Sequence, residues 1–504
     1  MKSIRSIAQA TALSSATALA LSVQAALPAA GTLSTTNDPL NNARVTAEEH
    51  RWVVRILAQH PGMSAAPYNV TPGRIYSDSC VQNGQRKIFA SLSTKANSAA
   101  TSRSGTIVSA NVGATGALSG FAQRDFPECK EMNGIVAASD CSTVAALCRR
   151  PSSATGATKD LVASLTDATW KDWLTANSTD DHMWLYEWKN TALSPLPASP
   201  TNRYVVSKAI GGGWEIGHQN LVMNDTHYGI SLKSTTGGTT QHQGDSFIVV
   251  SRTAPAIDTT RGWLWACGKG HTESNRPAIY GQGAFAALCT TDWHGVDGDF
   301  TKGGIWMHVE KQDPVLVRAI YRSTQSANRF NGGATSLVAL SGGGFLGVYA
   351  ATDGTTTMPT KIGMVRLNST GGVMWREWIR ESPDYFLSYP QLVSLGIDSA
   401  GNQRFLVGWA RMMPYVSPST FDNPSPSDSQ RVASLYTVQE FDASGNPKTE
   451  LRDVRHGWGE QDQMVPLGKG RAGWVYMPDP RYSTPLPTPT ATSLQWSTYT
   501  STSM

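Results

Sequence analysis

The sequence is short of charge, and it lacks a long apolar run outside its N-terminus. Only 16% of the 504 residues are Asp, Glu, Lys or Arg, whereas about a quarter is usual in soluble proteins. The formal charge is +4, and no basic run extends beyond Arg149-Arg150. We therefore expect little electrostatic attraction to nucleic acid or to an anionic membrane.

Several motifs that mark common enzymes are also missing. The chain has no GxSxG elbow, no Walker loop, no dinucleotide-binding glycine fingerprint after a strand and no CxxCH. Their absence disfavours a serine hydrolase of that class, a nucleotide enzyme and a c-type cytochrome. No CxxC, HxH or HExxH spacing is present either, so a Cys-rich zinc site is disfavoured.

The first 25 residues have the pattern of a secretory signal. Lys2 and Arg5 form a positive start, residues 10–23 are uncharged and mostly apolar, and Val23-Gln24-Ala25 fits a cleavage site. The apolar run is shorter than the ~20 residues that span a bilayer. We predict a secreted or periplasmic protein without a transmembrane segment in its mature form.

The cysteine content fits an oxidising compartment. All of the cysteines follow the signal, and their even number favours disulfides in an exported chain. They are Cys80, Cys129, Cys141, Cys148, Cys267 and Cys289. Nearness along the chain suggests the pairs Cys80–Cys129, Cys141–Cys148 and Cys267–Cys289.

Helical periodicity is confined to one segment. We expect residues 26–45 to form a loose leader and residues 46–60 a helix, because Thr46 and Glu49 form a capping box before an apolar stripe. Residues 26–62 thus precede a main domain over 63–504. Within that domain, residues 412–431 are rich in Pro and Ser and residues 477–491 are rich in Pro and Thr, so both read as loops or insertions.

The rest of the chain alternates short apolar stretches with turn residues, and it repeats. Residues 337–349, 392–409 and 464–476 each read as a strand, a glycine turn and an apolar strand that ends in an aromatic residue. Residues 361–372 and 435–446 supply further strands. Weaker copies occur at 87–112, 134–148, 220–232 and 278–289.

A unit of four strands that recurs about seven times, roughly every 55 to 70 residues, is typical of a β-propeller. We therefore predict an all-β propeller of about seven four-stranded blades with a short N-terminal helix. Residues 492–499 are a candidate for the strand that closes the ring. The competing architecture is a pair of β-sandwiches, which need not repeat a four-stranded unit.

The blade periodicity resembles that of bacterial secreted β-propeller proteins. Some of these are polysaccharide lyases of the ulvan type, which use His and Tyr with an Arg as catalytic groups. The periodicity and the presence of those residue types carry the resemblance, and no catalytic motif matches position by position. The resemblance implies a lyase as one possible activity.

Candidate site residues concentrate between positions 214 and 308, where six of the ten histidines lie. For a lyase, a base, an acid and a group that neutralises the uronate carboxylate are needed. The candidates are His218, His227, His271, Arg276 and Tyr280, with Tyr228 as an alternative acid. In the structural alternative, the same His and Asp residues tie strand ends together by hydrogen bonds.

Two further kinds of site are candidates in this region. His242 with Asp245, or Asp292 with His294, offers imidazole and carboxylate ligands for zinc or copper, and the acidic residues also suggest calcium. Trp263, Trp265 and Trp293 fall outside the repeat pattern, and exposed indoles stack on sugar rings.

The leading functional prediction is recognition of an extracellular ligand, a glycan or a surface partner, at one mouth of the central channel. The first alternative is an enzyme that cleaves an anionic, uronate-containing polysaccharide by β-elimination. The second is a structural protein of the envelope or matrix. The alternatives differ in whether His, Tyr and Arg converge in one cleft.

Overall fold

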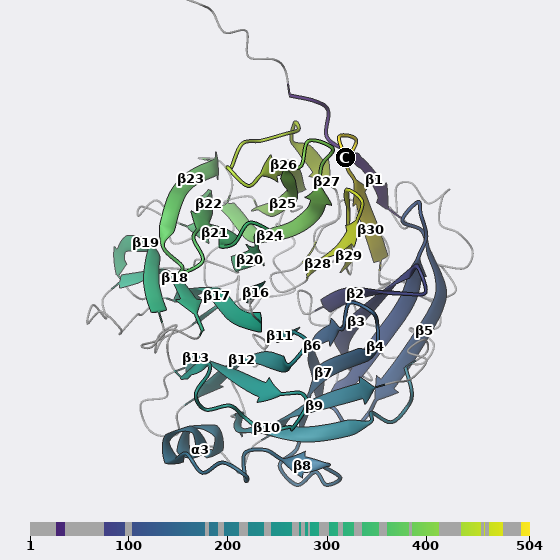
Figure 1. Ribbon diagram of the computed structural model, residues 1–504, viewed down its shortest axis with the longest axis vertical. Helices are drawn as coiled ribbons and strands as arrows, with labels where there is room; N and C mark the ends of the chain where they lie inside the picture. The colour runs from purple at the N-terminus through teal and green to yellow at the C-terminus, as the bar shows by residue number, and fades with distance from the viewer. Residues whose placement is uncertain are drawn as a thin grey trace, which may run out of the picture.

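The computed structural model is a seven-bladed β-propeller, as the repeat predicts (Figure 1). Seven sheets of four or five strands stand around a common axis. The structure describes residues 27–35, 75–95, 103–176, 181–189, 196–210, 220–235, 243–264, 272–273, 278–280, 283–291, 302–310, 316–326, 335–351, 360–382, 386–412, 435–454, 458, 463–476 and 495–504.

The first four blades follow one another along the chain. Blade 1 contains β2 (Tyr76–Gln82), β3 (Gln85–Lys95), β4 (Arg103–Val112) and β5 (Leu118–Phe126). Blade 2 contains β6 (Glu131–Ala137), β7 (Thr143–Arg150), β9 (Asp181–Lys189), β10 (Asn202–Ile210) and, at its outer edge, β8 (Lys159–Asp160). Blade 3 contains β11 (Asn220–Met223), β12 (His227–Thr235), β13 (Gln243–Ser251) and β14 (Trp263–Leu264). Blade 4 contains β15 (Thr272–Glu273) and β16 (Ala278–Tyr280), both paired with β17 (Ala284–Thr291), then β18 (Lys302–Val309) and β19 (Leu316–Ser326).

The last three blades repeat the pattern. Blade 5 contains β20 (Thr335–Ala339), β21 (Phe345–Ala351), β22 (Lys361–Leu367) and β23 (Val373–Glu381). Blade 6 contains β24 (Phe386–Ile397), β25 (Gln403–Met412), β26 (Leu435–Asp442) and β27 (Arg452–Val454). Blade 7 contains β28 (Met464–Gly468), β29 (Arg471–Tyr476), β30 (Gln495–Thr500) and β1 (Thr32–Thr35).

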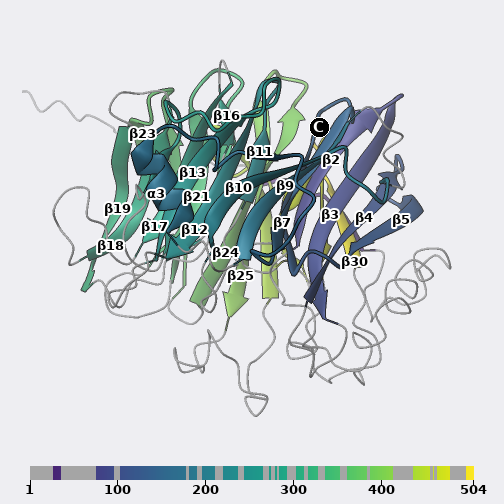
Figure 2. The same ribbon diagram turned by 90° about the horizontal axis from the view of Figure 1, so that it is seen from below.

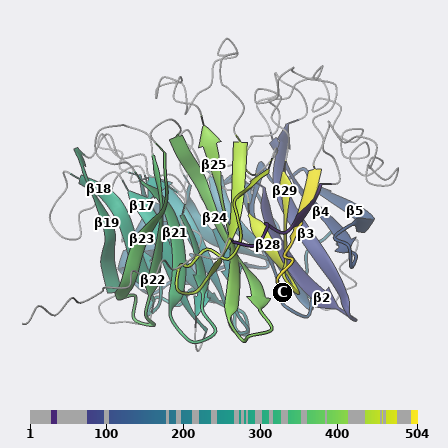
Figure 3. The ribbon, with the colours of Figure 1, turned by 90° about the horizontal axis from the view of Figure 1, so that it is seen from above.

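The first strands of the blades form the inner ring. β2 contacts β6, β6 contacts β11, and contacts continue through β16, β20, β24 and β28 back to β2. Figures 2 and 3 show the blades edge-on, with the strands steeply inclined around the axis. Because each blade covers the apolar face of its neighbour, the ring buries sheet faces that a single blade would expose.

The ring closes through strands from both ends of the chain. β1 forms the outer strand of blade 7 and pairs antiparallel with β30, so that Thr32 faces Thr500. The hydroxyl of Tyr499 accepts the N–H of Gly31 at 2.7 Å, and Arg452 donates to the carbonyl of Gly31 at 2.9 Å. The prediction of a closing strand near 492–499 is therefore confirmed. The expectation that residues 26–45 form only a loose leader is wrong for residues 32–35, because a strand this short carries no apolar repeat and is fixed by distant partners.

Glycines in second strands make room for buried indole rings. A Cβ at Gly408 would lie 2.5 Å from the ring of Trp458, and a Cβ at Gly473 would lie 2.3 Å from that of Trp496. Both indoles are fully buried. The glycine before the aromatic residue of the repeat is thus a packing requirement, since any larger side chain would collide with a locked ring.

Buried glutamates occupy three seams between blades. Glu187 of blade 2 accepts a short hydrogen bond from the Tyr228 hydroxyl of blade 3. Glu440 of blade 6 accepts one from Tyr499 of blade 7 at 2.7 Å. After β18, Glu310 pairs with Arg261 of blade 3. Each carboxylate is 0% or 1% exposed, and such groups are stable in the interior only when they are hydrogen-bonded.

The described residues contain one helix, α3 (Ala168–Thr175), which lies against β10. Asp167 caps it by accepting the N–H of Trp170 at 3.0 Å. Across the ranges given above, no helix is long and apolar enough to cross a membrane. The predicted signal (residues 1–25) and the predicted helix at 46–60 lie outside the described residues, as do 477–491 and all of 412–431 except Met412.

Most of the predicted hairpins coincide with the first two strands of a blade. The exception is residues 87–112, which form the second and third strands of blade 1. Its first strand, β2, was missed because YSDSCVQ alternates weakly between apolar and polar residues.

The predicted disulfide pairing is wrong for four cysteines. Cys80 bonds to Cys141, and Cys129 bonds to Cys148. The turn between β6 and β7 places Cys141 beside β2 of the neighbouring blade, which nearness along the chain does not reveal. Cys289 is also disulfide-bonded, and its predicted partner, Cys267, lies outside the described residues.

Candidate functional site

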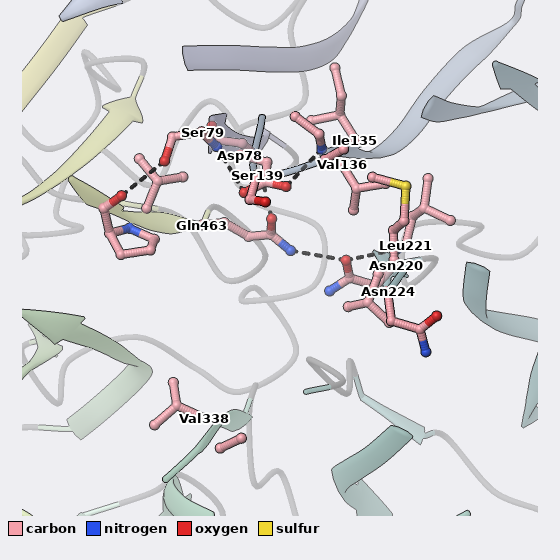
Figure 4. A pocket seen from close by; sticks show the side chains of 18 of the residues that line it. Asp78, Ser79, Ile135, Val136, Ser139, Asn220, Leu221, Asn224, Val338 and Gln463 are labelled. Carbon is pink, nitrogen blue, oxygen red and sulfur yellow. Dashed lines mark hydrogen bonds between the residues drawn. The ribbon is translucent and has the colours of Figure 1, made fainter. Parts of the chain in front are cut away.

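A cavity of about 820 Å³ lies within the inner ring. First strands of blades 1, 2, 3, 5 and 7 line it, together with the turns that follow β6 and β11. Figure 4 shows these side chains converging from different blades. The lining combines amide, hydroxyl and carboxylate groups with short aliphatic side chains.

Two amide side chains bridge the channel at one end of the cavity. Gln463, just before β28 of blade 7, donates its Nε2–H to Oδ1 of Asn220 in blade 3 at 3.0 Å (Figure 4). Oδ1 of Asn220 also accepts the N–H of Leu221 at 2.8 Å, and Oε1 of Gln463 accepts the N–H of Ser77 at 3.4 Å. Asn220 and Gln463 are each 7% exposed. The bond joins blades that are not neighbours in the ring, so it narrows the channel there.

Asp78 supplies a carboxylate on the wall. Its Oδ2 accepts the N–H of Ala137 in blade 2 at 2.9 Å, and its Oδ1 accepts the N–H of Ser79 at 2.8 Å. Beside it, the Ser79 hydroxyl donates to the carbonyl of Pro466 in blade 7 at 2.9 Å. Asp78 therefore fixes the seam between blades 1 and 2 while it lines the cavity.

The opposite end of the cavity is shaped by the turn after β11. Nδ2 of Asn224 donates to the carbonyl of Gly283 in blade 4 at 2.5 Å, and Oδ1 accepts the N–H groups of Thr226 and His227. Arg252 donates to the carbonyl of Asn224 at 2.6 Å. These bonds hold the turn rigidly, since every polar atom of the Asn224 side chain is engaged.

His227, a predicted catalytic residue, lies next to this turn and does not line the cavity. Its Nδ1 is 3.0 Å from Nη1 of Arg261 and 2.8 Å from the Thr226 hydroxyl. A guanidinium only donates, so Nδ1 is an acceptor and the ring is bound to the buried Arg261–Glu310 pair. This arrangement matches the structural alternative, in which histidines tie strand ends together.

Tyr228, the alternative acid, is buried between blades 2 and 3. Its pKa is raised by burial and by the negative charge of Glu187, to which its hydroxyl donates. A phenol held protonated at a seam does not reach the cavity, so Tyr228 serves packing there.

Trp263, a predicted ligand-binding residue, is only 4% exposed. Its ring stacks on Phe247 at 4.6 Å and on His308 at 5.1 Å between ring centroids. The expectation of an exposed stacking surface is therefore wrong for Trp263. Its ring is buried between blades 3 and 4, where it packs against His308.

The remaining site predictions are not brought together by the described residues. Asp245 belongs to β13 and Tyr280 to β16, and their side chains are not described. The others lie outside the described residues, namely His218, His242, His271, Arg276, Trp265, Asp292, Trp293 and His294. Among the side chains that are described, no group of three His, Cys, Asp or Glu residues is arranged to hold a metal, and zinc and calcium stay predictions.

No family model and no curated protein sequence matches the chain. Solved structures show likeness of fold. The endo-arabinase from Bacteroides thetaiotaomicron VPI-5482 is 10% identical, with 56% of this chain and 89% of that chain covered and a TM-score of 0.29. The Hadza microbial sialidase Hz136 is 9% identical, with 67% and 62% covered and a TM-score of 0.36. The catalytic domain of the Coprinopsis cinerea GH62 α-L-arabinofuranosidase is 10% identical, with 59% and 96% covered and a TM-score of 0.28.

At this level of identity the likeness concerns the fold alone. The resemblance to propeller-type polysaccharide lyases gains no support from these comparisons. The function must therefore be argued from the cavity itself.

The residues that build the cavity were missed by the sequence analysis. Asp78, Asn220 and Gln463 lie 142 or more residues apart along the chain, judged by their numbers. A usable signal did exist, since Asn220 opens the hairpin predicted at 220–232 and Gln463 precedes the one predicted at 464–476. First strands of propeller blades line the channel, so polar residues at their starts are the ones to select.

Proposed function

We propose that this protein is an exported β-propeller that binds a small, neutral, polyhydroxylated ligand, such as a saccharide unit, in its central cavity. The observation that carries the proposal is the cavity of about 820 Å³ lined by convergent polar groups. Small-molecule sites commonly measure about 300 to 1,000 Å³. Export is supported by the two disulfides, which form in oxidising compartments.

The chemistry of the lining suits a sugar ring. Amide and hydroxyl groups of Asn220, Gln463 and Ser139 alternate with the aliphatic side chains of Ile135 and Val338. A sugar presents hydroxyl groups at its edge and C–H groups on its faces. A mixed lining of this kind can form hydrogen bonds with the hydroxyl groups and apolar contacts with the C–H groups.

Charge favours a neutral ligand over a polyanion. The ionisable side chains that line the cavity are Asp78, Asp225 and Arg252. Arg252 already donates to Asn224 and to Thr143, so the lining holds two carboxylates against one engaged cation. A uronate carboxylate would meet like charge there, which raises the cost of its desolvation. The cavity thus favours recognition of a neutral ligand over the β-elimination alternative.

Binding is tested by titration calorimetry of the mature protein against neutral mono- and disaccharides and against uronates. Val338→Phe fills the cavity from β20, and we expect it to weaken binding by at least about tenfold, since the ligand and the new ring would compete for the same space. Val373→Phe adds the same ring to an exposed site on β23 and should leave binding unchanged. Tight binding of uronates alone, or equal binding by both variants, would contradict the proposal.

A further inference from the structure

The amide bridge at the end of the cavity has a fixed direction. Backbone N–H groups can only donate, so the N–H of Ser77 selects Oε1 of Gln463 and the N–H of Leu221 selects Oδ1 of Asn220. Nε2 of Gln463 then donates to the same Oδ1 at 3.0 Å. If either amide group were rotated to exchange its oxygen and nitrogen, its NH₂ group would face a backbone N–H, and two donors would meet without an acceptor. The orientation of both side chains is therefore set by the backbone at each end of the bridge.

At Asn220 this direction presents a donor rather than an acceptor to a ligand. Oδ1 of Asn220 already accepts two hydrogen bonds, whereas its Nδ2 carries two N–H groups. Within the described part of the chain, no acceptor lies within hydrogen-bond distance of that nitrogen. Asn220 lines the cavity, and only 7% of its surface is exposed. The second N–H group of Gln463 Nε2 lies beside it.

A donor that lines the cavity gains a hydrogen bond when a ligand places an acceptor beside it, so this end of the cavity is suited to an acceptor oxygen. A hydroxyl is a weaker match at Asn220, because it must also place its own proton and Oδ1 already accepts two hydrogen bonds. A carboxylate is a strong acceptor, but Asp78 and Asp225 give the lining a negative charge. A neutral carbonyl combines acceptor-only chemistry with the absence of charge.

We infer that the bridge of Asn220 and Gln463 is a subsite for a neutral carbonyl oxygen, such as that of an acetamido group, and that the ligand is an N-acetylated sugar. The inference rests on the proposed function, since it names the class of saccharide that the cavity takes. Asn220 is the residue that determines this preference, because its Nδ2 supplies donors at the cavity wall.

The first test compares matched sugars with the unmodified mature protein by titration calorimetry. N-acetylglucosamine against glucose, and N-acetylgalactosamine against galactose, differ by the acetamido group alone. One well-placed neutral hydrogen bond is worth about fivefold to tenfold in affinity, so we expect the acetylated member of at least one pair to bind tighter by about that factor. Equal binding within both pairs would overturn the subsite while leaving the proposed function intact. If no saccharide bound at all, both would fail.

The second test replaces the donor. Asn220→Asp keeps an oxygen that can accept from Gln463 and Leu221 but removes both N–H groups of Nδ2. We expect the advantage of the acetylated sugar to disappear in this variant. Asn368→Asp is the matched control, because Asn368 caps an exposed turn through Oδ1 contacts with the N–H groups of Thr370 and Gly372, and it should keep the advantage. If the Asn220→Asp protein still bound the acetylated sugar tighter by the full factor, the assignment would be overturned. If this variant does not fold, the comparison of matched sugars with the unmodified protein still tests the subsite.

Discussion

Removing the two described disulfides one at a time should destabilise the protein by different, calculable amounts. Cys80–Cys141 closes 61 residues and ties β2 of blade 1 to the turn after β6 in blade 2. Cys129–Cys148 closes 19 residues and staples blade 2 internally. With the chain-entropy relation, the longer loop is worth about 4 kcal/mol and the shorter one about 3 kcal/mol at 25 °C. All four cysteines are buried, so double replacement by alanine removes similar packing in both cases.

The measurement is urea unfolding of the Cys80→Ala/Cys141→Ala and Cys129→Ala/Cys148→Ala proteins. Both curves are fitted with the same dependence of the free energy of unfolding on urea concentration, so that a lower midpoint means a lower free energy of unfolding. Peptide mapping without reduction establishes which cysteines are joined. We expect the first variant to unfold at the lower urea concentration. A peptide that joins Cys80 to Cys129, or a larger loss of stability in the second variant, would refute the reasoning.

Three further predictions concern the seams and the buried phenols. Gly408→Ala should destabilise the protein by about 1 to 3 kcal/mol, because the added methyl collides with a buried indole, whereas Gly342→Ala, with nothing within 4 Å, should be neutral in the same thermal melts. Tyr499→Phe removes a hydroxyl that bridges the carboxylate of Glu440 and the N-terminal segment, so the free energy of unfolding should fall by about 1 to 3 kcal/mol. Tyr349→Phe removes a hydroxyl that has no hydrogen-bond partner among the described residues, and an equal loss of stability there would contradict the argument. Burial, with the charge of Glu128, raises the pKa of Tyr186 to about 12. The neutral phenol therefore contributes stability that is complete below its ordinary pKa of about 10 and is lost as the pH rises toward 12, and ultraviolet titration of Tyr186→Phe against wild type should show one late phenol fewer.

The repeated hairpin could be predicted because its physics is local. Alternation of apolar residues, a glycine turn and a terminal aromatic residue recur at 337–349, 392–409 and 464–476, and each requires only neighbouring residues to form. Burial of the resulting faces then requires a ring of blades. The count of seven followed from the same periodicity, and the closing strand predicted at 492–499 overlaps β30 (Gln495–Thr500).

The cavity could not be predicted in the same way, because its residues become neighbours only when the ring closes. Gln463 reaches Asn220 across the channel and Asp78 binds the backbone of Ala137 in the next blade. None of these contacts leaves a spacing in the sequence. The histidine-rich region drew attention instead, and there the structure shows Trp263 stacked on His308 of the next blade and His227 bound to Arg261.

The sequence by itself determined the class of fold, the number of blades and the presence of disulfides, since alternation, turn residues and cysteine content act over short distances or over the whole composition. The tertiary structure decided which cysteines pair, which aromatic rings are buried, that residues 32–35 complete the last blade, and which polar groups face the channel. Those outcomes depend on the register between strands of different blades, and register is fixed by the packing of the closed ring rather than by any single segment.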